Sequence, residues 1–406
     1  MIGKVKKYRE QTFSSLKIRN YRLYFIGQAI SLCGTWMQTI AQSWLVLKIT
    51  GSGTALGLVI ALQFLPILFL GPWAGVVSDR FPKRKILYYT QTASGLLALI
   101  LGILTATGTV QLWIVDLLAL LLGFVNAFDN PTRQTFVLEM VSKEKLANAV
   151  SLNSTQMNLA RVIGPAIAGV LIATLGIALC FIINAISYIA VLIALCMMDA
   201  GQLNGTPRAT RLKGQLKEGL NYVRQHPSLK NTLLMMAVIG TLCYEFIVSL
   251  PLFAQFTFHG DAGVYAAMNA AMGLGSVFGG LFIASRKNIT ISMLTNAALL
   301  FGASMLVLSI APTIMLALTA LVFVGVFSIN FLSLSNIILQ LESPPEMRGR
   351  IMALWSVAFL GSTPIGGPII GFIGEHIGPR WGLATGGFGA LIAAIIYITT
   401  IKPLSP

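Results

Sequence analysis

The chain has 406 residues, of which 56% are hydrophobic and only 10% carry a charge. Its mean hydropathy is +0.80, whereas about a quarter of the residues in an average soluble domain are charged. A soluble protein of this length could not cover its surface with so few charges, so the composition predicts a polytopic membrane protein. The net charge of +15 raises the question of nucleic-acid binding, which the placement of the cations answers.

Apolar segments of spanning length follow a basic arm at residues 1–22. A helix needs about 20 residues to cross the hydrocarbon core, and a polar stretch at 199–230 divides the segments into two sets of six. The first set covers 23–47, 53–78, 86–107, 111–138, 148–174 and 177–198, and the second covers 231–257, 262–285, 289–311, 313–340, 350–376 and 380–401. We therefore predict domains at 1–198 and 231–406, joined by a cytoplasmic linker at 199–230.

Lysine and arginine are distributed unevenly between the two sides of this arrangement. If both termini are cytoplasmic, all but four of the 28 cations fall at the cytoplasmic side. The exceptions are Lys48, Arg133, Arg161 and Arg380. Cytoplasmic loops of membrane proteins carry such an excess, so the pattern predicts that both termini lie inside. Because the cations follow one membrane face, we expect no nucleic-acid partner.

The linker has its own helical pattern. Leucine and valine recur at helical spacing among basic residues, at Leu212, Leu216, Leu220 and Val223. This pattern is typical of a short amphipathic helix on the inner leaflet, and an ordinary linker helix is the alternative.

A short loop between the second and third apolar segments carries the most specific motif. Residues 71–85 read GPWAGVVSDRFPKRK, a small-residue segment followed by an acid, a turn and several cations. The stretch resembles the loop between helices 2 and 3 of the major facilitator superfamily, whose pattern is roughly G-x-x-x-D-R-x-x-R-R/K. The matching residues are Gly75, Asp79, Arg80, Lys83 and Arg84. The resemblance implies a gating role for them and an all-α fold of 12 transmembrane helices in two pseudo-symmetric six-helix bundles.

Two glycine–proline stretches, half the chain apart, support an internal repeat. Residues 164–169 read GPAIAG and residues 366–371 read GGPIIG. The first resembles a superfamily pattern of proton-coupled exporters that ends G-P-x-x-G-G, and it keeps Gly164, Pro165 and Gly169. The stretch 126–154 resembles the branch that includes enterobactin and macrolide exporters.

Ionisable groups deep in apolar segments are the expected working residues of a membrane protein. At about 1.5 Å per residue, Asp129, Arg161 and Glu245 share one level near the membrane midplane. Asp129 has cations within reach, so we expect it to stay ionised, either as a latch with Arg161 or as a simple helix-face pair with Arg133. Glu245 has no cation in its apolar helix, so desolvation favours its neutral form. It is the first candidate for a proton carrier, and Asp129 is the second.

Uncharged polar residues supply further candidates for a substrate cavity. The first apolar segment carries Gln28, Thr35, Gln38 and Gln42 on one helical face. Such a stripe faces a wet cavity or joins neighbouring helices by hydrogen bonds. The candidate cavity residues are Arg161, Gln38, Gln42, Asn126, Asn158, Asn269 and Asn330.

The sequence contains no P-loop, nucleophile elbow or zinc spacing, so we expect no enzymatic activity, cofactor or metal. The superfamily resemblance implies a secondary active exporter of amphipathic organic molecules (drug, macrolide or siderophore) that works by proton-coupled antiport and alternating access. An uptake symporter of the same fold is the main alternative, and a non-transporting membrane sensor is another. We expect a monomer in the inner membrane of a bacterium, with substrate, protons and the lipid bilayer as its partners.

Overall fold

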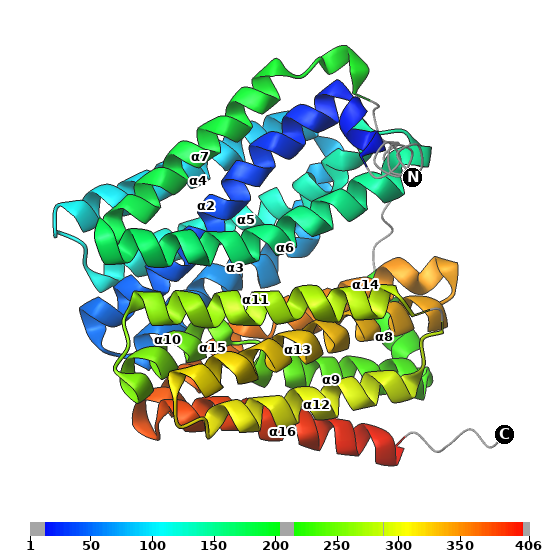
Figure 1. Ribbon diagram of the computed structural model, residues 1–406. Coiled ribbons are helices and arrows are strands. Elements are labelled where there is room, and N and C mark those ends of the chain that lie inside the picture. Colours follow the sequence, from blue (N-terminus) through cyan, green and yellow to red (C-terminus); the bar gives the residue numbers. More distant parts are fainter. Residues whose placement is uncertain (1–12, 204–214, 287, 401–406) are drawn as a thin grey trace, which may run out of the picture. The chain divides into compact units, whose positions relative to one another are not determined.

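The computed structural model describes residues 13–203, 215–286 and 288–400. In these ranges the regular structure is helical throughout, without a strand (Figure 1). Eleven helices of the described part are long and apolar enough to cross a membrane. The segment predicted as the remaining span forms the helix α2 (Arg19–Thr50), with 32 residues, which is not among these eleven. The predicted all-helical membrane fold is confirmed, and most of the basic arm, residues 1–12, lies outside the described residues.

The first six spans agree with their predicted limits to within a few residues. A 3₁₀ turn, η1 (Ser14–Lys17), precedes α2, and the short η2 (Ala200–Gln202) follows the sixth span. Gly108 and Gly176 adopt φ angles of 71° and 91°, a conformation that favours glycine, in the turns after the third and fifth spans. The five spans after α2 are α3 (Gly53–Arg80), α4 (Lys83–Ala106), α5 (Leu112–Met140), α6 (Lys143–Thr174) and α7 (Ile177–Met197).

Two spans of the second half are broken, whereas the sequence predicts continuous helices at 231–257 and 350–376. The first is divided into α9 (Pro227–Cys243), α10 (Phe246–Leu252) and a π-helical turn η3 (Phe253–Thr257). The second is divided into α14 (Pro345–Leu360) and α15 (Thr363–His376). Pro364 in the first turn of α15 has no N–H to donate to the carbonyl four residues earlier, so the helical hydrogen bonds are interrupted there. The unbroken spans are α11 (Ala262–Ala284), α12 (Ile291–Ser309), α13 (Ile314–Glu342) and α16 (Pro379–Thr400).

The linker forms the helix α8 (Gln215–Gln225). Val223 is buried in a cluster with Leu229 and Ile351, and Glu218 pairs with Arg350 at 2.6 Å. This helix therefore packs against α14 of its own unit. Leu220 is 40% exposed, while Leu212 and the Leu216 side chain lie outside the described residues.

The chain forms two compact units whose boundary runs through α2 and α3. One unit comprises Met1–Ala41 and Phe69–Thr210, and the other comprises Gln42–Leu68 and Arg211–Pro406. The end of α2 and the first half of α3 therefore pack with helices from the second half of the chain. The limits 1–198, 199–230 and 231–406, which follow chain order, stay a prediction.

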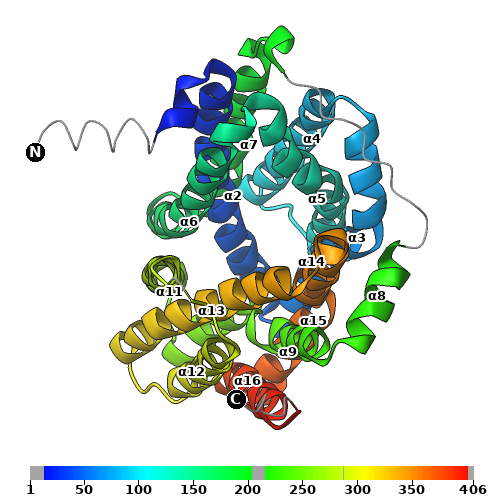
Figure 2. The ribbon, with the colours of Figure 1, turned by 90° about the vertical axis from the view of Figure 1, so that its right-hand side faces the viewer.

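Each unit has its own core. In the first unit, Tyr24 and Phe136 meet edge to face with ring centroids 5.6 Å apart, within a buried cluster that includes Leu87 and Val191. In the second unit, α11 and α13 lie side by side (Figures 1 and 2). Gly275 and Gly325 bring these two backbones together, because a Cβ at either position would collide with a carbonyl of the other helix. Small residues permit such close packing in membranes.

Candidate transport site

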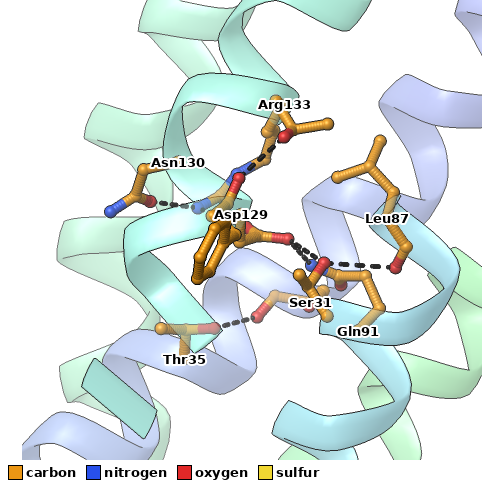
Figure 3. A network of polar contacts seen from close by, with 10 residues as sticks. Ser31, Thr35, Leu87, Gln91, Asp129, Asn130 and Arg133 are labelled. Atoms are coloured by element: carbon orange, nitrogen blue, oxygen red, sulfur yellow. Dashed lines mark hydrogen bonds and ion pairs between the residues drawn. The ribbon is translucent and has the colours of Figure 1, made fainter. Parts of the chain in front are cut away.

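Asp129 lies at the centre of a hydrogen-bonded network in the first unit (Figure 3). Thr90 Oγ1 and Gln91 Nε2, both from α4, donate to Asp129 Oδ1 at 2.7 and 2.8 Å. Arg133, one turn further along α5, approaches Asp129 Oδ2 at 3.1 Å and also donates to Asn130 at 2.9 Å. This buried carboxylate therefore has three donors, one of them a cation.

Arg161, four residues before Pro165 of the glycine–proline motif in α6, lies beside an aromatic ring. Its guanidinium lies over the Trp36 ring, 5.0 Å from the centroid. A Cβ on Gly164 would stand 2.6 Å from Trp36 Cβ, so glycine is what lets α6 approach α2 here. Pro165, inside α6, has no N–H to donate to the carbonyl of Arg161. The motif thus positions a cation and an aromatic face together, and Gly169 is buried on the same helix.

Glu245 stands at the break between α9 and α10, only 3% exposed. Among the described residues, no donor lies within hydrogen-bond distance of its Oε1 atom, and no salt bridge includes it. Thr363, at the start of α15, faces the carboxylate. The surroundings of Glu245 therefore differ from those of Asp129, which has a cation and two further donors within hydrogen-bond distance.

The breaks in the two discontinuous spans lie against each other. A Cβ on Gly240 of α9 would stand 2.8 Å from the carbonyl oxygen of Ala358 and 3.0 Å from Ser362 Oγ. A Cβ on Gly366 of α15 would collide with the carbonyl of Thr241. Broken helices free backbone N–H and C=O groups, and in transporters such interruptions line substrate and ion sites. Sequence reasoning missed this feature, although the run from Gly361 to Pro364 is a helix-stop signal.

The motif between α3 and α4, for which a gating role is predicted, ties the start of α4 to two neighbouring helices. Lys83 Nζ pairs with Glu139 Oε1 of α5 at 2.7 Å, with side chains 6% and 14% exposed. Arg84 donates to the carbonyls of Leu195 and Cys196 at the end of α7, at 2.8 and 3.2 Å. A cation at a helix C-terminus satisfies free carbonyls and opposes the helix dipole. Lys83 and Arg84 therefore join α4 to α5 and α7.

For the remaining motif residues the structure gives the position in the helix. Gly75 lies inside α3 and Arg80 is its exposed last residue. Asp79 belongs to the same helix, but its side chain lies outside the described part. The sequence analysis did not identify Glu139, which lies one residue beyond the predicted limit of its span. An acidic residue close to a basic loop was the signal that could have indicated an ion pair there.

The two glutamines predicted for the cavity lie in α2 and are buried. Asn184 of α7 donates to Gln38 Oε1 at 2.6 Å. Gln42 Nε2 donates to Gln63 of α3 at 3.3 Å. Both side chains thus join neighbouring helices, which was the alternative to a cavity stripe.

The four predicted asparagines divide into buried and half-buried pairs. Asn269 donates to a carbonyl one turn earlier in α11, at 3.0 Å. The Asn330 amide, with its nitrogen directed at α11, donates to the Gly279 carbonyl at 2.7 Å. Asn126 in α5 and Asn158 in α6 are half-buried, so they are the asparagines with surface left for a substrate.

Solved structures of transporters share this fold. A crystal structure of a nucleoside transporter matches with a TM-score of 0.72 and 14% identity, covering 95% of this chain and 99% of that one. A bacterial homologue of the iron transporter ferroportin, in an inward-facing state, matches with a TM-score of 0.71 and 14% identity, covering 94% and 98%. Together with the eleven apolar helices of membrane-spanning length among the described residues, these likenesses define a multi-pass membrane protein with the major facilitator fold.

The family model described as transmembrane secretion effector matches residues 10–404, so the chain belongs to that family of the major facilitator superfamily. The staphyloferrin A transporter of Staphylococcus aureus is 25% identical over 361 residues, covering 88% of this chain and 90% of that protein. The multidrug efflux pump Tap of Mycolicibacterium fortuitum is 25% identical, covering 84% and 87%. Macrolide efflux protein A of Streptococcus pyogenes is 21% identical, covering 95% and 96%. The predicted resemblance is confirmed.

Proposed function

We propose that this protein exports small amphipathic organic molecules across the cytoplasmic membrane of a bacterium by proton-coupled antiport. Membership of the secretion effector family supports export. The names of its relatives supply the substrate classes, namely a siderophore, macrolides and drugs. The positive-inside pattern supports cytoplasmic termini.

The observation that carries the coupling proposal is the position of Glu245. A proton carrier must bind and release a proton during the cycle, which requires a carboxylate oxygen that fixed donors do not occupy. Three donors approach Asp129, whereas Glu245 is buried at the break between α9 and α10, and its Oε1 has no hydrogen-bond partner among the described residues. Glu245 binds the proton that enters from outside and releases it inside, and Asp129 with Arg133 maintains the packing of α4 against α5.

Substrate recognition would use the Arg161–Trp36 pair. An arginine held over an aromatic ring offers a cation for carboxylate groups and an apolar face for rings. Asn126 and Asn158 add half-buried amide groups. Such a mixture suits amphipathic molecules with at least one acidic or polar group.

Transport by the purified protein in proteoliposomes tests this function. Staphyloferrin A, a macrolide and a fluorescent drug would be supplied with and without an imposed pH gradient. We expect at least one of them to accumulate against its concentration gradient only while the pH gradient exists, and a protonophore to abolish the accumulation. Uphill transport in the same direction as proton flow would establish a symporter instead. Transport that ignores the pH gradient would reject proton coupling.

A further inference from the structure

A carboxylate near the end of α15 holds the corner between α2 and α3. Ser52 Oγ and the backbone N–H of Thr54 both donate to Glu375 Oε2, at 2.7 and 2.8 Å. The first N–H groups of a helix have no partner within it, so an acid at the start of α3 satisfies one of them and complements the helix dipole. All three residues belong to the same compact unit, and the charge pattern places this corner outside.

Next to this carboxylate, α3 and α15 cross at four glycines. Gly53 and Gly57 are one turn apart in α3, as are Gly367 and Gly371 in α15. A Cβ on Gly53 would stand 2.7 Å from the Gly371 carbonyl oxygen, and a Cβ on Gly367 would stand 3.1 Å from that of Gly57. The two backbones therefore touch, as paired G-x-x-x-G segments allow in membranes.

We propose that Glu375 is the latch of this outer contact, and that its release is a step of the transport cycle. The proposal rests on the proposed function. Residues 42–68 belong by chain to the first half and by contact to the unit of the second half. Movement of the start of α3, which belongs by chain to the first half, away from α15 during the cycle would break this contact.

The nature of the contact suits reversible opening. Both hydrogen bonds of Glu375 are exposed, so water can replace them at modest cost. At the glycine crossing the two backbones touch directly, so no interlocking side chains have to separate. Gly367 also lies between the two sites, because a Cβ there would stand 3.1 Å from Gly57 O and 3.7 Å from Glu245 Oε2. The contact that Glu375 stabilises therefore extends along α15 to the proposed proton carrier, Glu245.

A reversible cross-link tests whether the contact must open. In a background without the four native cysteines, the pair Ser52→Cys and Glu375→Cys would be oxidised and then reduced. We expect the oxidised protein to lose at least tenfold in transport rate and to recover on reduction. Equal transport by the oxidised and reduced forms would show that the contact stays closed during transport, and would overturn the proposal.

A distance measurement tests the latch without any substrate. Spin labels at Lys48→Cys and Ile377→Cys, both at exposed positions, would report the separation of the corner from the end of α15. Loss of a charge-assisted pair of hydrogen bonds should lower the closed-to-open ratio by about tenfold in Glu375→Gln.

The matched control is Asp261→Asn. Asp261 caps only its own helix, through Val264 N at 3.1 Å, so this variant should leave the ratio unchanged. The same ratio in wild type and Glu375→Gln would overturn the latch. If no substrate is carried by the wild type but Glu375→Gln shifts the ratio, the latch stands and the proposed function fails.

Discussion

Glu245 and Gly366 are in contact where two broken spans meet. A Cβ on Gly366 would stand 2.8 Å from Glu245 Oε1, and it would collide with the Thr241 carbonyl. Because Gly366 has no side chain, the buried carboxylate and the end of α9 can approach α15 closely. A residue larger than glycine at this position must displace either the carboxylate or the backbone of α9.

Replacing Gly366 with alanine should destabilise the protein by about 1–3 kcal/mol, the usual cost of overpacking, and should slow transport. Gly280→Ala is the matched control, because a Cβ at Gly280 of α11 meets nothing within 4 Å and alanine favours a helix. Thermal unfolding in detergent measures both variants. Equal melting temperatures for the two would contradict the close contact.

The Lys83–Glu139 pair makes a second prediction. Glu139→Gln removes the carboxylate from the buried Lys83 ammonium, so it should lower stability by about 1.5–3 kcal/mol, the value of a hydrogen bond to a charged group. The double variant Lys83→Met with Glu139→Leu should recover most of that stability, because an apolar pair replaces a buried ion pair at little cost. Unfolding midpoints compare the three proteins. A single variant as stable as wild type would show that the pair is not formed in the membrane.

Arg84 and Lys85 allow a comparison of neighbouring cations. Arg84 bonds to two carbonyls at the end of α7, whereas Lys85 is exposed. Arg84→Ala should therefore lower stability by about 1.5 kcal/mol, and Lys85→Ala should change it little. Both variants lose one positive charge, so an equal loss would indicate an effect of topology or lipid binding rather than of helix capping.

Arg161 should influence substrate affinity more than turnover. If its guanidinium over Trp36 binds an acidic group, Arg161→Gln should raise KM for an acidic substrate about tenfold, because a charged hydrogen bond of about 1.5 kcal/mol is lost. The KM of a neutral substrate serves as the internal control. Equal changes for acidic and neutral substrates would contradict a binding role for Arg161.

Much of the fold could be predicted from the sequence, because the length and hydropathy of each span are local properties. The limits of α5, α6 and α7 agree with the apolar segments, and Pro165 lies inside α6 as expected. The breaks at Tyr244–Glu245 and Gly361–Ser362 were missed, because both lie within apolar runs long enough for one helix. Their positions depend on the packing of α9 against α14 and α15, which a linear pattern does not contain.

The sequence predicted which residues form the candidate site, but not which residues of other helices they contact. The sequence identified Asp129 and its in-helix neighbour Arg133, one turn apart, and the structure pairs them at 3.1 Å. Thr90 and Gln91 come from another helix, and nothing in the chain order brings them to Asp129. The contrast between a well-coordinated Asp129 and a poorly coordinated Glu245 likewise depends on contacts between helices.

Uphill transport by Glu245→Gln is the most direct test of the account. The variant would be compared with wild type and Asp129→Asn in proteoliposomes, under an imposed pH gradient and in substrate exchange without one. We predict that Glu245→Gln loses gradient-driven accumulation but keeps exchange, while Asp129→Asn still accumulates substrate, at a reduced rate. Uphill transport by Glu245→Gln together with its loss in Asp129→Asn would contradict the assignment and make Asp129 the proton carrier.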